Sequence, residues 1–225
     1  PGGYWKYLDD GSNQGTLWRD PAADDGSWLE GFSQFGYGEG DEATVVSYGG
    51  DPDNKHITTY FRQEFVLADN KLVTDLALRL MRDDGALVYL NGHEVLRSNM
   101  SNGSIDYRTR ASESVSGTNS GGYSGGYSGG YKRRYSSNIY RNEDTFLDYA
   151  IDPGWLVDGV NVLAVEVHLN RDNSEDMSFD LELSAGIDLV EDIIPPDSIN
   201  LSLISFGTSW GNTVITGQAG AAEAF

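Results

Sequence analysis

Apolar and polar residues alternate with a period of two along four separate stretches of this 225-residue chain. In one of them, Leu76, Leu78 and Leu80 alternate with Ala77 and Arg79. This period places successive side chains on opposite faces of a strand, and it is typical of antiparallel sheets with one face in the core. The four stretches are residues 57–67, 76–81, 163–169 and 179–183.

Turn signals separate these stretches, as expected of many short strands. They are Asp84-Gly85, Asn91-Gly92, Asn102-Gly103 and Asp158-Gly159. No segment has the pattern of an amphipathic helix, and only residues 153–156 indicate a short helical turn. The sequence therefore predicts an all-β fold, an antiparallel two-sheet sandwich of the jelly-roll type.

A basic, tyrosine-rich insertion interrupts the strand pattern at residues 112–143. Three Ser-Gly-Gly-Tyr repeats occupy 120–131 and a Lys-Arg-Arg-Tyr unit follows. From Arg108 to Arg141 there are six basic residues and one acidic residue, a net charge of +5. The other nine basic and 34 acidic residues give −25. Gly/Ser-rich stretches are most often solvated linkers, but tyrosines on a basic loop can also contact an acidic neighbour.

After residue 190 the pattern changes again. Pro195-Pro196 is a linker signal, and 199–206 and 213–216 are two short strand-like runs. We therefore predict a sandwich domain over 1–190 and a linker with a strand-like tail over 191–225. Two strands do not make a stable domain, so the tail pairs with the sandwich, begins a further domain or adds to a sheet edge of another molecule.

Composition excludes some classes of function. The net charge of −20 disfavours binding to nucleic acid or to anionic membranes. The chain has no run of about 18 apolar residues, which predicts no membrane insertion. It has no cysteine, so neither a disulfide nor thiolate chemistry is available. This composition allows an extracellular or cell-surface location, which is the location we expect.

Several blocks of sequence resemble a known family. They are 5–12, 18–21, 24–28, 35–38, 57–62, 78–92, 159–168 and 178–183. Together they resemble the galactose-binding-like jelly-roll modules of secreted bacterial multidomain proteins. The blocks VYLNG (88–92) and GVNVLAVEVH (159–168) are also similar to the sugar-binding jelly roll of β-galactosidase-type glycosidases. The resemblance implies the fold over residues 4–185, and modules of this kind variously bind glycans, bind calcium or brace a neighbouring domain.

Catalytic signatures are weak. His56, His93 and His168 are isolated, with no metal-ligand spacing, and are expected on strand faces. Residues 207–211 match G-x-S-x-G, but no histidine follows them and no strand–turn–helix is predicted there. We therefore predict that the chain is not an enzyme.

No cofactor is certain, and calcium is the one plausible ion because clustered carboxylates suit a hard cation. The candidate ligands are Asp20, Asp24 and Asp25. Solvated turn acids remain the alternative.

Two functions of different class remain open. The first is a self-assembling structural subunit of a fibre or surface layer, whose insertion and tail contact other copies of the chain. The second is a carbohydrate-binding accessory module of a secreted enzyme, with the insertion or Trp18 and Trp210 as sugar platforms; a bracing domain without a ligand is a third. The predicted contact residues for assembly or glycan binding are Tyr123, Tyr127, Tyr131, Lys132, Arg133, Arg134, Tyr135 and Trp210.

Overall fold

A computed structural model describes residues 2–115 and 145–188 with their side chains, and the backbone of 204–209 and 212–217. The chain divides into two compact units, residues 1–188 and 189–225. The described part of the second unit is a hairpin of β12 (Ile204–Ser209) and β13 (Asn212–Gly217).

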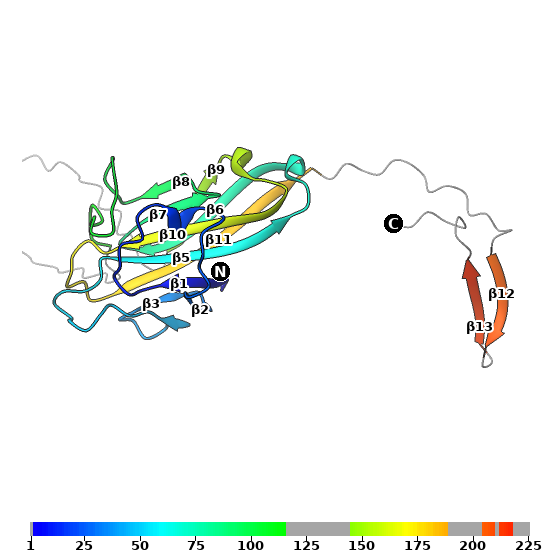
Figure 1. The fold of residues 1–225 in the computed structure, drawn as a ribbon, viewed down its shortest axis with the longest axis horizontal. Coiled ribbons are helices and arrows are strands. Elements are labelled where there is room, and N and C mark those ends of the chain that lie inside the picture. Colours follow the sequence, from blue (N-terminus) through cyan, green and yellow to red (C-terminus); the bar gives the residue numbers. More distant parts are fainter. Residues whose placement is uncertain (1, 116–144, 189–203, 210–211, 218–225) are drawn as a thin grey trace, which may run out of the picture. The chain divides into compact units, whose positions relative to one another are not determined.

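The first unit is a sandwich of two sheets, as predicted (Figure 1). A six-stranded sheet has the strand order β2-β1-β5-β10-β7-β8, and a five-stranded sheet has the order β4-β3-β11-β6-β9. The pairs are antiparallel except for β3 with β4. The six-stranded sheet contains β1 (Tyr4–Leu8), β2 (Leu29–Phe32), β5 (Thr58–Leu67), β7 (Gly85–Leu90), β8 (His93–Ser98) and β10 (Gly159–His168). The five-stranded sheet contains β3 (Phe35–Tyr37), β4 (Thr44–Val45), β6 (Val73–Asp83), β9 (Leu147–Ile151) and β11 (Met177–Ile187).

Helical structure in the described residues is limited to three 3₁₀ turns: η1 (Leu17–Arg19), η2 (Asn70–Leu72) and η3 (Pro153–Trp155). The last coincides with the helical turn expected at 153–156. Within the described part of the chain, no helix has the length and hydrophobicity needed to cross a bilayer.

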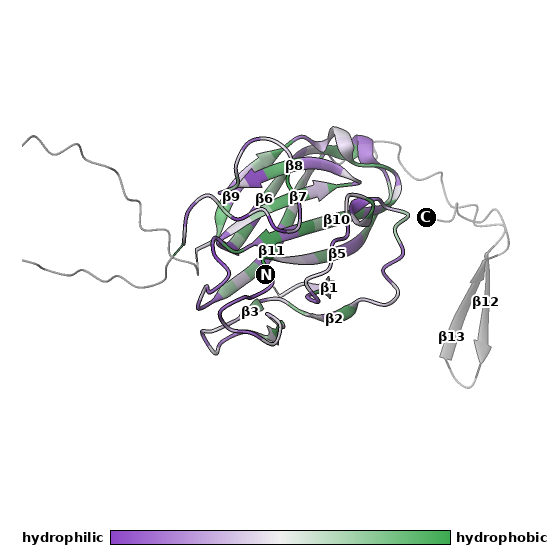
Figure 2. Cartoon of the chain, turned by 60° about the vertical axis from the view of Figure 1, so that its left-hand side comes forward, coloured by the Kyte–Doolittle hydropathy of each residue, from purple (hydrophilic) through white to green (hydrophobic). Residues whose placement is uncertain are grey.

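The main core lies between the two sheets, where the inward-facing members of the alternating stretches meet. Hydrophobic residues are concentrated in the strands and hydrophilic ones in the connections (Figure 2). Phe61 of the six-stranded sheet and Phe179 of the five-stranded sheet are fully buried, with ring centroids 4.2 Å apart. Trp5 of β1, the strand next to β5, packs edge-on against Phe179. Removing these rings from water is the main favourable contribution to folding.

One predicted turn has a different role. Asp84-Gly85 has the sequence of a hairpin turn, but β6 and β7 on either side of it belong to different sheets. The dipeptide is therefore the corner at which the chain crosses from one sheet to the other. Asp84 is fully buried there, and its carboxylate accepts hydrogen bonds from the backbone N–H groups of Val115 and Asn170, each over 2.7 Å. A buried carboxylate needs such partners, and Asp84 thereby joins two loops to the corner.

The VYLNG and GVNVLAVEVH blocks meet in space through their asparagines. Asn91 and Gly92 both have positive φ, 51° and 84°, and form the two-residue turn between β7 and β8. The Asn91 Nδ2 group donates to Asn161 Oδ1 over 2.8 Å. Asn161 is fully buried, and its Nδ2 donates in turn to the carbonyl oxygens of Val157 and Gly159. This pair of side chains fixes the hairpin to the start of β10.

The outer face of the six-stranded sheet is also covered. A second hydrophobic cluster lies there, under the loops 9–28 and 99–115, and is separate from the main core. Its buried members are Trp18, Tyr60, Leu87, Tyr89, Met100, Ala111 and Ala164. The sequence predicted one buried face per strand, but residues 58–62 of β5, all of β7 and residues 161–168 of β10 are buried on both faces.

Candidate functional site

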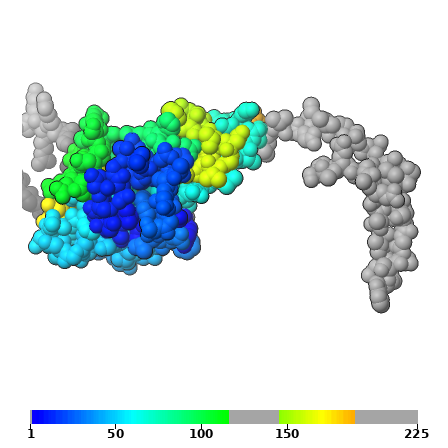
Figure 3. Space-filling view, in the orientation of Figure 1, coloured from blue at the N-terminus to red at the C-terminus, as the bar shows by residue number. Residues whose placement is uncertain are grey.

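A charged side chain fastens the loop 9–28 to the six-stranded sheet. Arg62 of β5 points to the outer face, and its side chain is only 2% exposed. Its Nη1 group donates to the backbone carbonyl oxygens of Trp18 and of Asp20, the latter over 3.0 Å. Its Nε group donates to Asp25 Oδ2 over 2.7 Å. In the space-filling view, the N-terminal segment in blue lies over the middle of this face (Figure 3).

Asp25 is held from two sides. Arg62 contacts one carboxylate oxygen, and Lys6 of β1 donates to the other over 2.6 Å. Burial acts to raise the pKa of Asp25, but the hydrogen bonds and positive charges of Lys6 and Arg62 outweigh it, so the pKa lies below its ordinary value. Asp25 therefore remains ionised and paired at neutral pH.

Two tryptophans of the loop form an aromatic surface above the sheet. Trp18 is 5% exposed, and its ring centroid lies 4.8 Å from that of Tyr60. Trp28 is half-buried and stacks on Trp18, with an interplanar angle of 26° and a centroid separation of 6.4 Å. Trp18 thus supports Trp28 from below, and Trp28 keeps part of its ring open to solvent.

A cavity of about 520 Å³ opens beside Trp28. Its apolar lining includes Trp18, Trp28 and the strongly exposed Leu17, and Arg62 lies at the sheet side. Polar lining comes from Gln14, Asp20 and Asp24. An apolar cleft with a few fixed polar groups is the usual form of a small-molecule site in proteins. We call this cavity, with its lining, the tryptophan groove.

The carboxylates at the rim of the groove are held by local turns. Asp20 Oδ1 accepts from the backbone N–H of Ala22 over 2.8 Å, and Asp24 Oδ1 accepts from that of Gly26 over 3.0 Å. Such hydrogen bonds to the chain two residues ahead are the reason Asp favours turns. In each side chain the second oxygen, Oδ2, has no protein partner among the described contacts and faces solvent or a ligand.

A hydrogen-bonded network lies beneath the groove. The Tyr89 hydroxyl donates to Glu166 Oε1 over 2.6 Å, and Glu166 Oε2 lies 3.4 Å from His168 Nε2. Burial, followed by the negative charge of Glu166, raises the pKa of both Tyr60 and Tyr89. Both hydroxyls therefore remain protonated, and the network holds Glu166 within the sheet rather than in the cavity.

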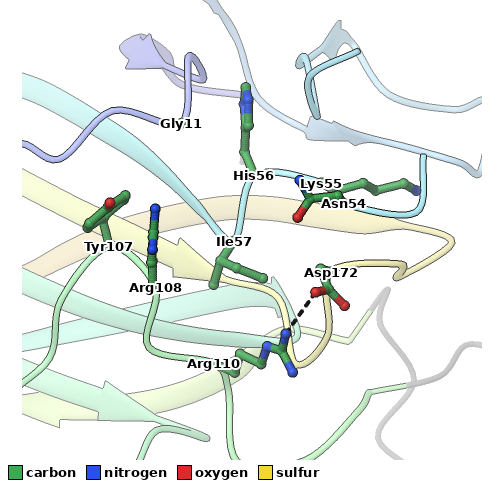
Figure 4. Close-up of a pocket in the computed structure, with 9 residues that line it drawn as sticks. All are labelled: Gly11, Asn54, Lys55, His56, Ile57, Tyr107, Arg108, Arg110 and Asp172. Carbon is green, nitrogen blue, oxygen red and sulfur yellow. Dashed lines mark hydrogen bonds and ion pairs between the residues drawn. The ribbon is translucent and has the colours of Figure 1, made fainter. Parts of the chain in front are cut away.

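A second cavity of about 360 Å³ lies among the loops that precede β5 and follow β10 (Figure 4). Lys55, Arg108 and Arg110 line it, and each already has a partner. Lys55 Nζ lies 4.5 Å from the ring centroid of Tyr48, and Arg108 lies over the ring of Tyr107, which also lines the cavity. Arg110 is directed at Asp172 of the same lining, to which it donates over 2.8 Å. Unlike the tryptophan groove, this cavity has no tryptophan in its lining.

The residues predicted to form adhesive contacts cannot be placed. They lie outside the described residues, and so does most of the insertion that contains them. These residues are Tyr123, Tyr127, Tyr131, Lys132, Arg133, Arg134, Tyr135 and Trp210.

The three predicted calcium ligands lie close together along the loop, but they are committed to other contacts. Asp25 is paired with Lys6 and Arg62, and one oxygen each of Asp20 and Asp24 is used by its own turn. In residues 2–115 and 145–188, no three acidic or histidine side chains gather in the manner of a metal site. Calcium binding at Asp20, Asp24 and Asp25 remains a prediction from sequence.

Sequence reasoning assigned the two tryptophans differently. It offered Trp18 as a sugar platform and did not single out Trp28 for binding. In the structure Trp18 is the buried support and Trp28 is the half-buried ring above it. It also missed Arg62, because only the alternation of 57–67 was apparent and a lone arginine in a strand is ordinarily solvent-facing.

No protein-family model matches this chain, and no curated protein matches it. Among solved structures, a β-glucuronidase of Bacteroides uniformis aligns with 80% of the chain at 20% identity and a TM-score of 0.47. Its β-glucuronidase 2, bound to cyclophellitol-6-carboxylate aziridine, aligns with 82% at 21% identity and a TM-score of 0.47. A Ruminococcus gnavus β-glucuronidase in complex with D-glucuronic acid aligns with 75% at 14% identity and a TM-score of 0.40.

The aligned part is a small share of those proteins, 17%, 17% and 21% of their chains respectively. Similarity at this level provides no argument about activity, and the fold follows from the sheets themselves. The protein is an all-β, mostly antiparallel two-sheet sandwich with an aromatic groove on the outer face of its six-stranded sheet.

Proposed function

We propose that this chain is a non-catalytic carbohydrate-binding module, and that the tryptophan groove is its glycan site. The observation on which the proposal depends is the position of Trp28, a half-exposed indole held against a buried tryptophan and bordered by polar side chains. A sugar ring has one apolar face of C–H groups and a rim of hydroxyls. An aromatic platform with hydrogen-bonding groups around it is complementary to both.

The platform is rigid. Trp18 and Tyr60 pack against Trp28, with Tyr60 at a centroid distance of 6.4 Å. Because the supporting rings are buried, Trp28 has little rotamer freedom to lose when a ligand stacks on it. Pre-organisation of this kind raises affinity by lowering the entropy cost of binding.

The polar rim suits hydroxyl groups. The Oδ2 atoms of Asp20 and Asp24 are acceptors for two ligand O–H groups, and the Gln14 side chain can donate and accept. The Nη2 group of Arg62 is buried and has no hydrogen-bond partner in the described part of the chain, so it is not counted among the groups of the rim. Buried polar groups without partners are costly, and an enclosed water molecule would satisfy this one.

A module of this kind would be an accessory part of a larger extracellular protein, with the galactose-binding-like jelly roll that the sequence blocks imply. Self-assembly through the insertion and tail has no support among the described residues. The groove favours glycan binding because it is a formed cavity with its own aromatic and polar lining.

Retardation in affinity gels tests the proposal. Native gels are cast with one soluble polysaccharide each, covering β-glucans, xylans, mannans and pectins. We expect at least one polysaccharide to retard the wild-type chain. Trp28→Ala should lower that affinity by at least about tenfold, the loss expected for an aromatic anchor in a binding site.

Trp155→Ala is the matched control. Trp155 is also an exposed tryptophan, 42% exposed, but it stacks on His93 and does not line the groove. The control should be retarded like the wild type. Retardation by no polysaccharide, or equal loss in both variants, would contradict the proposal.

A further inference from the structure

A smaller cavity adjoins the tryptophan groove. It measures about 220 Å³ and lies on the other side of Arg62, which lines both. The neighbouring residues Asp24 and Asp25 line one cavity each. The register of the sheet explains this arrangement, because Arg62 pairs directly with Lys6 and Lys6 with Glu30 on the next strand. All three residues of this row line the smaller cavity, and Arg62 at its end also lines the tryptophan groove.

We infer that the two cavities are two subsites for one ligand, an oligosaccharide without acidic groups, which spans both. This inference rests on the proposed glycan function of the tryptophan groove.

Tyr4 is the aromatic platform of the second subsite. Its ring is 49% exposed and lines the smaller cavity. Phe32 packs against the ring edge at a centroid distance of 4.9 Å, and the Tyr4 hydroxyl donates to Glu30 Oε2 over 2.8 Å. These two contacts orient the ring, as Trp18 orients Trp28 in the first subsite.

The charge of the two subsites determines the class of sugar. Lys6 and Arg62 are the positively charged groups that line them, and both are paired with Asp25. Asp20 and Asp24 at the first subsite, and Glu30 and Glu64 at the second, have no cationic partner among the described ion pairs. The carboxylate of a uronic acid would meet these negative charges, and like-charge contacts are an effective means of rejecting a ligand.

Calorimetric titration with short oligosaccharides tests the inference. The probes are cellohexaose, xylohexaose, mannohexaose and N-acetylchitohexaose, the disaccharide of whichever hexamer binds, and hexagalacturonate. We expect a neutral hexamer to bind at least about tenfold more tightly than its disaccharide, because only the hexamer reaches both platforms. Hexagalacturonate should not bind at low salt.

Tyr4→Ala locates the second subsite. The variant should lose about tenfold in affinity for the hexamer and keep the affinity of the disaccharide. Trp155→Ala should change neither. Equal affinities for hexamer and disaccharide, an unchanged hexamer affinity in Tyr4→Ala, or binding of hexagalacturonate as tight as that of the neutral hexamer would each overturn the inference while leaving glycan binding intact. Absence of binding by every glycan would instead refute the proposed function itself.

Discussion

Arg62 and Asp25 are 37 residues apart in the chain, and their side chains meet on the outer face of the six-stranded sheet, with 2.7 Å between Arg62 Nε and Asp25 Oδ2. The pair has two consequences. It holds the loop that contains both tryptophans of the groove, and it neutralises the arginine at the floor. The position of the candidate site therefore depends on non-local contacts: this ion pair, the second pair of Asp25 with Lys6, and the hydrogen bonds from Arg62 to the carbonyls of Trp18 and Asp20.

Removing the carboxylate should destabilise the fold. In Asp25→Asn the guanidinium of Arg62 remains buried without its counter-charge, and breaking such a pair costs about 3 kcal/mol. Urea denaturation of the wild type and the variant measures the difference. Asp148→Asn removes an exposed carboxylate whose partner, Arg79, is 47% exposed, and it should cost less than about 1 kcal/mol. Equal losses in the two variants would contradict the role given to Asp25.

Stability should also fall in acid. The pKa of Asp25 is lower in the folded chain than in the unfolded chain, where it is about 3.9. Its contribution is therefore complete above that value and is lost as the pH falls through the folded pKa. Denaturation midpoints between pH 6 and pH 2 should decline below about pH 4. In Asp25→Asn the denaturation midpoint should decline less steeply with falling pH than in the wild type. An identical slope would show that the pKa of Asp25 is not lowered in the folded chain.

The hydrogen-bonded pair Asn91 and Asn161 predicts a second position at which a substitution destabilises the fold. Asn161→Ala leaves Asn91 Nδ2 and the backbone N–H of Val157 without the oxygen to which they donate, over 2.8 and 2.9 Å. Unmade hydrogen bonds of buried groups cost about 1–3 kcal/mol each. We expect a loss of at least about 2 kcal/mol in urea denaturation. The exposed Asn54→Ala should stay within about 0.5 kcal/mol, the usual range for a surface change.

The close approach of strands β3 and β11 predicts a third position at which a substitution destabilises the fold. A Cβ added at Gly36 of β3 would lie 2.1 Å from the carbonyl oxygen of Met177 on β11. Gly36→Ala must therefore push the strands apart, at a cost of about 2 kcal/mol. Gly50→Ala is the control, because a Cβ there meets nothing within 4 Å. In thermal unfolding, Gly36→Ala should have a lower midpoint than the wild type, and Gly50→Ala should not. Equal midpoints for the two variants would show that the β3–β11 contact is looser than described.

The sequence predicts the four longest strands of the sandwich and does not predict the groove. Alternation predicts β5, β6, β10 and β11 because it records which face of each strand is buried. The corner at Asp84-Gly85 has the same local sequence as a hairpin turn, so only the pairing of its strands distinguishes the two. The groove requires Arg62 to meet a loop more than 30 residues away, which no local pattern encodes. Which of Trp18 and Trp28 is accessible to a ligand likewise depends on how the loop lies over the sheet.

The central claim is that a glycan stacks on Trp28, and the indole N–H resonances of the five tryptophans test it most directly. Two-dimensional ¹H–¹⁵N spectra of the wild type would be recorded during titration with a glycan that retards it in gels. Trp28→Phe and Trp155→Phe would assign the two exposed indoles. We predict a saturable shift of the Trp28 resonance while that of Trp155 stays in place. A glycan that binds and leaves the Trp28 resonance unmoved would contradict the account.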